Sequence, residues 1–424
     1  MLPIELIRDE PEKVKESMKK READPSKIDK LLDLDKKWRD LKQNVDDLRH
    51  KRNELSKKIN KAKKNKKEKK AKKLIKKAKD IPKKIEKKEG DMESVQEDRL
   101  HIWRNIPNIV QEDVPSGGEE NYKVLEEYGE IKKKKLKKGH ADLMEGWLID
   151  TEKASQVAGS RFYYLKGDLV KLNQAIINFA LDYLRDKEFQ LIQPPFMLNR
   201  EALEGAVTLE AFEDAIYKIE NEDLYLIGTA EHALNTYHSG EELNPKTLPL
   251  RYAGFSSCFR KEAGAHGKDT KGIFRVHQFE KVEQFIFSKP EDSWEEFQLL
   301  LQNTIELFKA MEIPFRTITL AAGDTSKAAT KTIDVEGYFP SQEKYRELAS
   351  CSNCLDFQAR RTNTRYQKDG DLEHVYTLNN TAIATERMIT CLIENHIQED
   401  GSIKIPKALQ KYTGFKKIKA KKEE

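Results

Sequence analysis

The sequence contains little cysteine. Only four of its 424 residues are cysteine, and just two of them, Cys351 and Cys354, lie close together. A disulfide framework needs more cysteines at regular spacing, and a four-ligand zinc site needs a second pair, so neither is indicated. We therefore expect structural thiols in a protein of a reducing compartment.

Long apolar runs are also absent. No segment approaches the length that spans a bilayer. Residues 1–5 do not start a basic stretch followed by an apolar run, so they match neither a secretory signal nor a transit peptide. These absences predict a cytoplasmic protein with no membrane partner. The net charge is only +5 although 36% of the residues are charged, so attraction to an anion must come from local clusters.

Two apolar seams with heptad spacing predict a helical hairpin near the N-terminus. Two interleaved rows of residues seven apart occupy residues 31–62, and a weaker seam follows over residues 74–102. Pro82 should kink or interrupt the second helix. We expect an antiparallel coiled-coil arm over about residues 27–104, roughly 50 Å long at ~1.5 Å per residue.

The segment that joins the two seams is a lysine run, residues 61–77, in which eleven of seventeen residues are lysine. Such runs are most often solvated and partly disordered. At the end of a projecting hairpin, however, lysines could lie along an RNA phosphate backbone, in a shape-directed and salt-dependent way. The candidate RNA contacts are Lys61, Lys63, Lys64, Lys66, Lys67, Lys69 and Lys70.

Residues 259–283 have the pattern of a nucleotide-binding hairpin. They open with Phe-Arg-Lys-Glu and close with Phe-Arg-Val-His-Gln-Phe-Glu-Lys-Val-Glu, and residues 263–273 between them are rich in glycine and basic residues. The alternation of the flanks predicts two antiparallel strands joined by a long, flexible basic loop. Arginine can bind phosphate and phenylalanine can stack on a base, but an ordinary hairpin with surface charge would show the same pattern.

This stretch resembles motif 2 of class II aminoacyl-tRNA synthetases, in the form found in seryl-tRNA synthetases. The resemblance implies that Arg260 holds the α-phosphate of ATP as a catalytic arginine. It also implies that Glu262 reads the adenine amino group and that Phe279 stacks on adenine. The ATP contacts implied within this motif are Arg260, Glu262, Arg275, Val276 and Phe279.

Two later segments resemble the same family. Residues 344–361 contain Glu347 and Ser350, which the resemblance implies as ATP contacts, with Glu347 also a ligand of Mg²⁺. Residues 377–387 match motif 3, whose Arg387 would hold the γ-phosphate as the second catalytic arginine. The Asn-Thr form of this motif is similar to archaeal and eukaryotic members.

A serine pocket is implied by the same resemblance. Residues 224–231 read as an apolar strand that ends in Thr-Ala-Glu, whose hydroxyl and carboxylate would bind the α-amino group. A carboxylate suits an ammonium group in a partly desolvated pocket. The implied serine contacts are Thr229, Glu231, Arg260, Glu283, Asn379 and Thr381.

The resemblance covers most of the chain and implies an α+β fold: the antiparallel class II sheet flanked by helices, with an N-terminal helical arm. We expect a tRNA-binding domain in residues 1–112, a catalytic domain in residues 113–415 and a disordered basic tail in residues 416–424. A helix over residues 169–187 and the strand after it resemble motif 1, which implies a homodimer.

The expected activity is that of a serine–tRNA ligase that uses ATP and Mg²⁺. Its partners would be L-serine, tRNA(Ser) and a second copy of the chain, and the charging of tRNA(Sec) is left open. His277 could be a general base, but its place in a Val-His-Gln-Phe strand favours a structural role. Two alternatives are a ligase that charges a carrier protein, which the long arm disfavours, and a non-catalytic RNA-binding protein, which the intact pocket residues disfavour.

Overall fold

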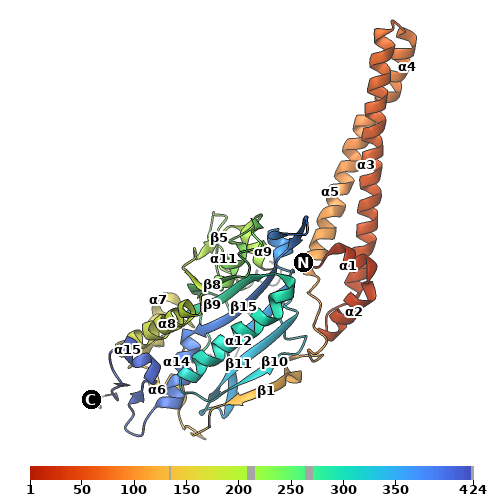
Figure 1. The fold of residues 1–424 in the computed structure, drawn as a ribbon. Helices are drawn as coiled ribbons and strands as arrows, with labels where there is room; N and C mark the ends of the chain where they lie inside the picture. Colours follow the sequence, from red (N-terminus) through yellow and green to blue (C-terminus); the bar gives the residue numbers. More distant parts are fainter. Residues whose placement is uncertain (133–134, 208–214, 263–270, 422–424) are drawn as a thin grey trace. The chain divides into compact units, whose positions relative to one another are not determined.

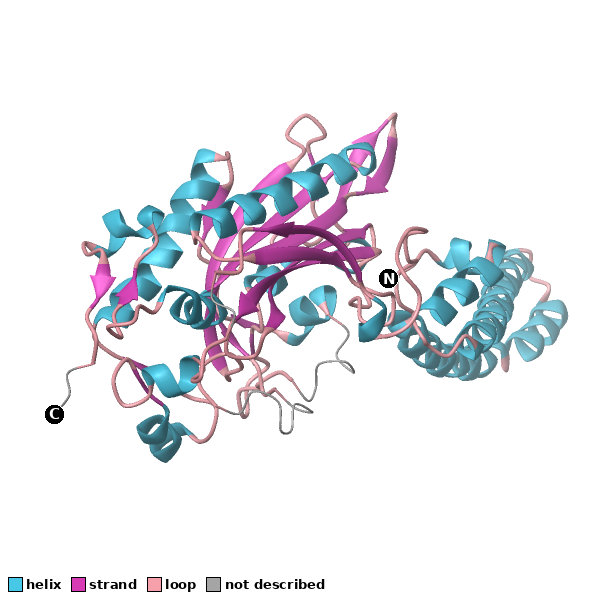
Figure 2. Cartoon of the chain, turned by 90° about the horizontal axis from the view of Figure 1, so that it is seen from below, coloured by secondary structure: helices cyan, strands magenta, loops and turns pink. Residues whose placement is uncertain are grey.

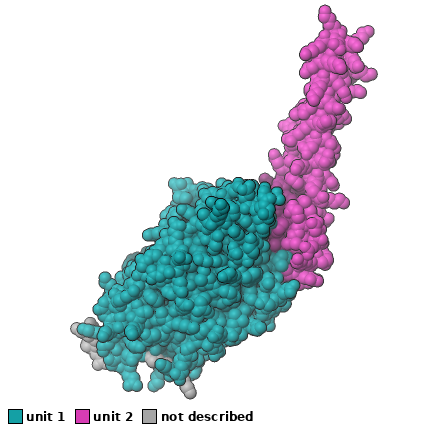
Figure 3. All heavy atoms as spheres, viewed as in Figure 1, with its two compact units in different colours: residues 1, 20–22, 108–424 teal, residues 2–19, 23–107 magenta. Residues whose placement is uncertain are grey.

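The structure, a computed structural model, describes the whole chain except for residues 133–134, 208–214, 263–270 and 422–424. The chain forms two compact units, coloured separately in Figure 3. The smaller unit comprises residues 2–19 and 23–107, and the larger comprises Met1, residues 20–22 and Asn108–Glu424. In the described part of the chain, no helix has both the length and the apolar character needed to cross a bilayer.

The smaller unit is helical and is built around one long hairpin (Figure 1). The first long helix of the hairpin, α3, has 39 residues and is about 60 Å long at ~1.5 Å per residue. Two helices, α4 and α5, return along it, so the predicted antiparallel arm is confirmed. The helices of this unit are α1 (Ile4–Asp9), α2 (Pro11–Lys20), α3 (Ser26–Lys64), α4 (Glu68–Ala78) and α5 (Ile81–Asn105).

Pro82 interrupts the returning half of the arm, as the sequence predicts. The helix α4 ends at Ala78, and Pro82 occupies one of the first two positions of α5. Backbone N–H groups in a first helical turn have no partner within the helix, so a proline there removes no internal hydrogen bond. The arm is therefore continued by a new helix, α5, whose first turn contains the proline.

The interior of the arm is mainly apolar, with Val45 and Leu55 buried as predicted, but it also contains a charged cluster. Asp35 is fully buried and accepts hydrogen bonds from Arg8 at 2.8 Å and from Arg99 at 2.9 Å. The heptad pattern did not predict this cluster, because a search for apolar positions passes over a buried carboxylate.

An eight-stranded sheet forms the centre of the larger unit (Figures 1 and 2). All of its neighbouring strands are antiparallel except β4 and β8, which are parallel. In spatial order the strands are β1 (Lys123–Tyr128), β10 (Phe315–Thr319), β11 (Lys331–Phe339), β12 (Lys344–Leu355), β15 (Tyr376–Ala384), β9 (Gln278–Ser288), β8 (Leu250–Phe259) and β4 (Gln190–Ile192).

Three helices cover this sheet and bury its apolar residues. The helix α12 (Ser293–Ala310) lies along it in contact with β12 and β15 (Figure 1), and α8 (Asp168–Asp186) and α14 (Thr385–His396) pack beside it. Phe285 of β9 and Phe297 of α12 are fully buried. The predicted α+β fold with a helix-flanked antiparallel sheet is confirmed.

Shorter elements surround the sheet. Among the described residues, the remaining helices are α6 (His140–Met144), α7 (Thr151–Ala158), α9 (Arg200–Ala206), α11 (Ala230–Thr236), α13 (Ala359–Thr362) and α15 (Gln410–Thr413), with 3₁₀ turns at Glu119–Asn121, Pro290–Asp292 and Lys407–Leu409. The remaining strands are β2 (Ile149–Asp150), β3 (Tyr164–Leu165), β5 (Met197–Leu198), β6 (Tyr225–Leu226), β7 (Glu242–Leu243), β13 (Arg365–Lys368), β14 (Asp371–His374), β16 (Ile403–Lys404) and β17 (Lys417–Ile418).

The basic tail, residues 416–424, differs from the expectation that it is disordered. Its strand β17 pairs with β16, and Ile418 lies opposite Ile403, with both side chains buried. A tail that is mostly lysine looks unstructured by composition, yet its single isoleucine is enough to attach it to the core. The last three residues, 422–424, lie outside the described part of the chain.

All four cysteines are free and buried, as expected of structural thiols. Burial raises the pKa of Cys351 and of Cys354 well above its usual range. A buried thiol with a raised pKa is a poor nucleophile, which argues against redox chemistry at this pair.

Candidate active site

The predicted nucleotide-binding hairpin is formed by β8 and β9, two neighbouring strands of the sheet. Their antiparallel pairing ends at Phe259 and Gln278, so Arg260 lies just beyond the end of β8 rather than within a strand. Glu262 has a φ of 49°, a left-handed conformation that turns the chain away from the strand direction. The strands are thus shorter at this end than predicted, and residues 263–270 of the predicted basic loop lie outside the described part of the chain.

Arg260 is held at its guanidinium by two contacts. Its Nε donates a hydrogen bond to the carbonyl of Gly228 at 3.1 Å, and its guanidinium carbon lies 5.2 Å from the centre of the Phe279 ring. Lys281 and Glu283 follow Phe279 at period two along β9, which directs all three side chains to the same face. An arginine, an aromatic ring and two further charged groups therefore line one side of the site.

Two other predicted ATP contacts lie in the segment that precedes β9. Arg275 Nε is 3.7 Å from a carboxylate oxygen of Glu262, an ion pair that spans the two ends of the hairpin connection. Val276 is buried. Glu262 and Val276 line the pocket beside Phe279, whereas Arg275 is not among its lining residues.

A β-bulge brings Glu347 and Ser350 onto one face of β12. Asp334 pairs with Ser350 and Val335 with Ala349, but the next residue of β11 pairs with Glu347, so Leu348 is an extra residue in β12. Residues three apart in a regular strand point to opposite faces, and the bulge removes that difference. Glu347 and Ser350, both predicted to contact ATP, consequently line the same cavity.

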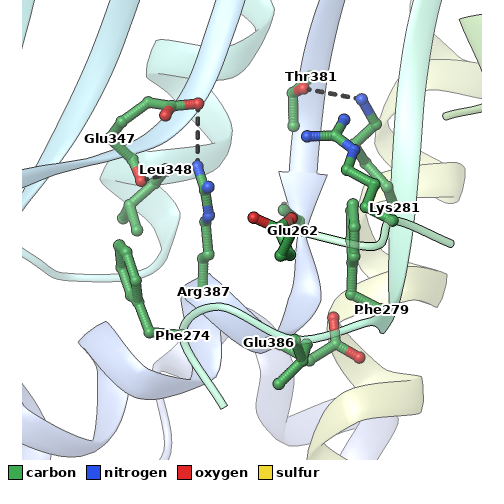
Figure 4. A pocket seen from close by; sticks show the side chains of 12 residues that line it. Glu262, Phe274, Phe279, Lys281, Glu347, Leu348, Thr381, Glu386 and Arg387 are labelled. Carbon is green, nitrogen blue, oxygen red and sulfur yellow. Dashed lines mark hydrogen bonds and ion pairs between the residues drawn. The ribbon is translucent and has the colours of Figure 1, made fainter. Parts of the chain in front are cut away.

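Arg387 faces Glu347 from the start of α14 (Figure 4). Its Nη1 lies 2.9 Å from Glu347 Oε1, and the guanidinium is 5.2 Å from the centre of the Phe274 ring. The charge of Arg387 lowers the pKa of Glu347. The two side chains form a charged pair on the side of the pocket opposite Phe279 and Lys281 (Figure 4).

The residues predicted to bind serine come together next to Arg260. Thr229 caps the N-terminus of α11, and its hydroxyl donates to Glu283 at 3.2 Å. Glu231 accepts hydrogen bonds from Gln358 at 2.8 Å and from Asn379 at 3.2 Å. Burial and the nearby charge of Glu283 raise the pKa of Glu231. This corner thus holds one buried carboxylate, Glu283, and one partly buried carboxylate, Glu231, which a bound cation would stabilise.

Lys281 is a site residue that the sequence reasoning did not select. Its ammonium group makes an ion pair with Glu283 and donates to the Thr381 hydroxyl at 3.4 Å. The period-two alternation after Phe279 could have identified it, since that pattern places residue 281 on the same face. Lys281 therefore balances the charge of Glu283.

Three more residues were missed. Gln358, which orients Glu231, lies in a segment of the resemblance that was noted without a role. His232 lines the cavity and is buried, and burial together with Arg260 and Lys281 lowers its pKa to about 3. Asp334 lies on a strand whose sequence carried no recognised motif. The place of Asp334 beside Ser350 is revealed only by the pairing of β11 with β12.

One cavity connects most of the predicted residues. It measures about 640 Å³ and adjoins a smaller pocket, and both are lined by Arg260, Glu262, Lys281, Glu347 and Thr381. The smaller pocket adds Phe279, Val276 and Arg387, and the larger adds Thr229, Glu231, Glu283, Ser350 and Asn379. Segments far apart in the sequence are therefore combined into a single polar site with an aromatic wall.

Asp334, Glu347 and Ser350 supply oxygen donors that line one cavity. Asp334 accepts a hydrogen bond from Ser350, and its other oxygen, Oδ1, is buried with no hydrogen-bond partner. Among the described residues, no three His, Cys, Asp or Glu side chains are close enough to hold an ion. Magnesium often takes one or two carboxylates and completes its shell with water and phosphate oxygens. The donors therefore fit an ion that is shared with a nucleotide.

The predicted RNA-binding lysines belong to the smaller unit. Lys61, Lys63 and Lys64 form the last turn of α3, and a short turn leads into α4. Instead of a long, partly disordered connection, most of the lysine run is helical. All seven predicted lysines are exposed: Lys61, Lys63, Lys64, Lys66, Lys67, Lys69 and Lys70.

Two family models match the chain. Residues 1–110 match the seryl-tRNA synthetase N-terminal domain, and residues 213–396 match the class II tRNA synthetase core domain of the G, H, P, S and T enzymes. The serine–tRNA ligase of Cenarchaeum symbiosum is 50% identical over 334 residues, covering 78% of this chain and 80% of the relative. That of Saccharolobus islandicus is 43% identical over 436 residues, covering 96% and 94%.

Solved structures give the same result. The seryl-tRNA synthetase of Pyrococcus horikoshii complexed with ATP has a TM-score of 0.92 and 43% identity, with all of both chains covered. The cytoplasmic serine–tRNA ligase of Naegleria fowleri in complex with AMP has a TM-score of 0.86 and 36% identity, covering 100% of this chain and 99% of the other. Together with the site described above, these similarities show that the chain belongs to the seryl-tRNA synthetase family.

Proposed function

We propose roles for the site residues in the reaction of a serine–tRNA ligase. The enzyme activates serine with ATP to seryl-adenylate and pyrophosphate, and then transfers the seryl group to the 3′ end of tRNA(Ser). The observation that carries the proposal is that the cavity and its adjoining pocket share Arg260: Phe279 and Arg387 line the pocket, and the carboxylates Glu231 and Glu283 line the cavity. Such an arrangement can hold a nucleotide and a small zwitterion next to each other.

ATP would bind in the smaller pocket, along the Phe279 ring. Its adenine would stack on Phe279, with Glu262 accepting from the exocyclic amine, and Arg275 and Val276 would complete the contacts. Arg260 would bind the α-phosphate and Arg387 the γ-phosphate. Because Arg260 lies between the adenine wall and the serine corner, it would also touch the serine carboxylate.

Serine would bind in the corner formed by Glu231 and Glu283. Its ammonium group would interact with Glu231 and Thr229, and its hydroxyl with Glu283, Thr381 and Asn379. A substrate without the hydroxyl would form none of these hydrogen bonds, which penalises alanine and glycine. The serine side chain would have to share Glu283 and Thr381 with Lys281, which contacts both.

The activation step is an in-line displacement. A serine carboxylate oxygen forms a bond to the α-phosphorus while the bond to the pyrophosphate oxygen breaks, and no side-chain nucleophile is needed. Positioning and charge neutralisation should therefore supply the rate enhancement. We propose that Glu347 and Ser350 hold a Mg²⁺ ion, which would neutralise phosphate charge when bound.

The arm and a second subunit would serve the transfer step. The exposed lysines of the arm suit the phosphate backbone of a tRNA, which would be bound largely without regard to sequence. We propose a homodimer on the resemblance of α8 and the strands after it to motif 1. Aminoacylation assays with tRNA(Sec) would answer whether that tRNA is also a substrate.

Amino-acid-dependent ATP–pyrophosphate exchange, followed by transfer to tRNA, tests the proposal. We expect exchange with serine, little with alanine or threonine, and subsequent charging of tRNA(Ser). Exchange without charging would instead support a ligase that serves a carrier protein. Absence of exchange with every amino acid would leave only the non-catalytic RNA-binding alternative.

A further inference from the structure

The side chain of His277 replaces a backbone hydrogen bond where β8 and β9 separate. Their regular pairing ends at Phe259 and Gln278. One residue further, the N–H of Arg260 donates to the carbonyl of His277 at 2.9 Å. The return bond to the Arg260 carbonyl comes from the imidazole Nδ1 of His277, at 2.8 Å. The backbone N–H of His277 is thereby available to Arg161, whose carbonyl it reaches at 3.1 Å.

The imidazole lies between aromatic side chains from two other segments. The Phe162 ring centre is 5.2 Å from that of His277, and the Tyr217 ring is 6.2 Å away and edge-on. The Tyr217 hydroxyl also lies 3.1 Å from Nδ1. A carbonyl oxygen can only accept, so the bond to Arg260 requires the hydrogen on Nδ1. The contacts therefore fix both the ring and its tautomer.

These contacts act on the backbone of Arg260. The other end of Arg260, its guanidinium, is held by the Gly228 carbonyl and the Phe279 ring. The next residue, Lys261, is fixed as well, because its N–H donates to the Ala215 carbonyl at 2.8 Å. The regular pairing of β8 with β9 has ended before Arg260. Among the described residues, His277 is the one whose side chain donates a hydrogen bond to the Arg260 carbonyl.

We propose that His277 is a positioning residue for Arg260. It holds the Arg260 backbone so that the guanidinium meets the α-phosphate of ATP, and it exchanges no proton with the substrate. The proposal rests on the role of Arg260 in the proposed function. A general base is not required in the activation step, because the serine carboxylate is already ionised at neutral pH.

Two variants separate the hydrogen bond from the ring. His277→Asn retains an N–H donor one bond from Cγ, whereas His277→Phe retains an aromatic ring without a donor. In serine-dependent ATP–pyrophosphate exchange, His277→Phe should lower kcat/KM for ATP by about 10- to 100-fold, as misplaced reacting groups do, with the KM for serine almost unchanged. His277→Asn should regain most of this loss.

Controls keep the result interpretable. Tyr217→Phe removes the other polar contact to Nδ1 and should retain wild-type kinetics. Thermal melting of each variant checks folding, and if His277→Phe does not fold, His277→Gln, whose donor is one bond further away, replaces it. His277→Asn should keep the wild-type pH profile. Loss of a pH-dependent limb in that variant would indicate a general base and would overturn the proposal.

A double-mutant cycle with Arg260→Lys gives the decisive comparison. If His277 acts through Arg260, adding His277→Phe to Arg260→Lys should cause little further loss. If the losses of kcat/KM caused by the two substitutions instead multiply in the double variant, the positioning role is overturned, while the function of Arg260 is not affected. Wild-type exchange by Arg260→Lys alone would instead contradict the proposed function of that arginine, so the two failures can be told apart.

Discussion

Glu231 is the side chain whose charge should matter most for serine binding. Burial and the charge of Glu283 raise its pKa, so the free carboxylate is destabilised until a cation arrives. Replacement by glutamine removes the charge and largely preserves the shape. We expect Glu231→Gln to raise the KM for serine by about 10- to 100-fold, because a charged hydrogen bond contributes about 1.5–3 kcal/mol. The KM for ATP, measured in the same exchange assay, should not change, and an equal rise in both would contradict the assignment.

Glu386, next to Arg387, should make stability depend on pH. Its carboxylate accepts hydrogen bonds from the Glu280 N–H at 3.0 Å and from the Thr385 hydroxyl at 2.9 Å, but burial still raises its pKa to about 7. The folded chain therefore keeps a proton that the unfolded chain has already released. The free energy of unfolding should fall as the pH rises from about 4.5 to about 7, by up to about 1.4 kcal/mol per pH unit.

Thermal unfolding of the wild type and of Glu386→Gln at several pH values tests this dependence. Glutamine cannot release a proton, so the wild type should lose stability relative to the variant as the pH rises through that window. Above about pH 7 the difference should be constant, because the carboxylate is then ionised in both folded and unfolded chains. A difference that does not vary with pH across the window would exclude Glu386 as the source.

Among the secondary-structure elements, the arm depends on its buried ionic cluster. Burial disfavours the Asp35 carboxylate, but hydrogen bonds from Arg8 and Arg99 outweigh this and lower its pKa. Replacement of Asp35 by alanine would leave Arg99, which is 5% exposed, without its main partner. We expect a loss of about 3–5 kcal/mol of stability in the smaller unit, as for other broken buried pairs.

Hydrogen exchange locates this effect. In Asp35→Ala, amide protection should fall in α3 and α5, while the strands of the larger unit should keep their protection. The matched control is Asp40→Ala, which removes an exposed carboxylate from the same helix. Equal protection in Asp35→Ala and in the control would show that the cluster contributes no stability.

The sequence alone predicted the helical arm, its interruption at Pro82 and the antiparallel pair β8 and β9, because periodicity and turn residues are local signals. It did not predict that Arg260 lies beyond its strand or that a bulge at Leu348 aligns Glu347 with Ser350. Those features depend on how neighbouring strands pair, and the residue pattern of a single strand does not determine that pairing. The site residues themselves came mainly from the family resemblance.

For the chain as a whole, the arm and the cavity should have separable effects. Replacing the lysines at the turn between α3 and α4 by serine should weaken tRNA charging and reduce its dependence on salt, because fewer phosphate contacts release fewer ions. Serine-dependent pyrophosphate exchange, which needs no tRNA, should be unchanged. The substituted residues would be Lys63, Lys64, Lys66, Lys67, Lys69 and Lys70.

Lysines elsewhere in the arm provide the control for that experiment. Lys27, Lys30, Lys36 and Lys37 are exposed on α3 but lie far along the helix from the turn. Their replacement changes the net charge without touching the proposed contact surface, and should affect charging less. If both sets weaken charging equally, the effect comes from overall charge and the turn is not the binding surface.

The most direct measurement is serine-dependent ATP–pyrophosphate exchange by the wild type and by Glu283→Ala. Glu283 is 1% exposed, lies in the cavity and contacts Lys281 and Thr229. Glu296→Ala is the control, since this buried carboxylate binds Arg251 and does not line the cavity. We predict that exchange by Glu283→Ala falls steeply through a higher KM for serine, while the control stays active. Full serine activation by Glu283→Ala would contradict the assignment of this cavity as the serine site.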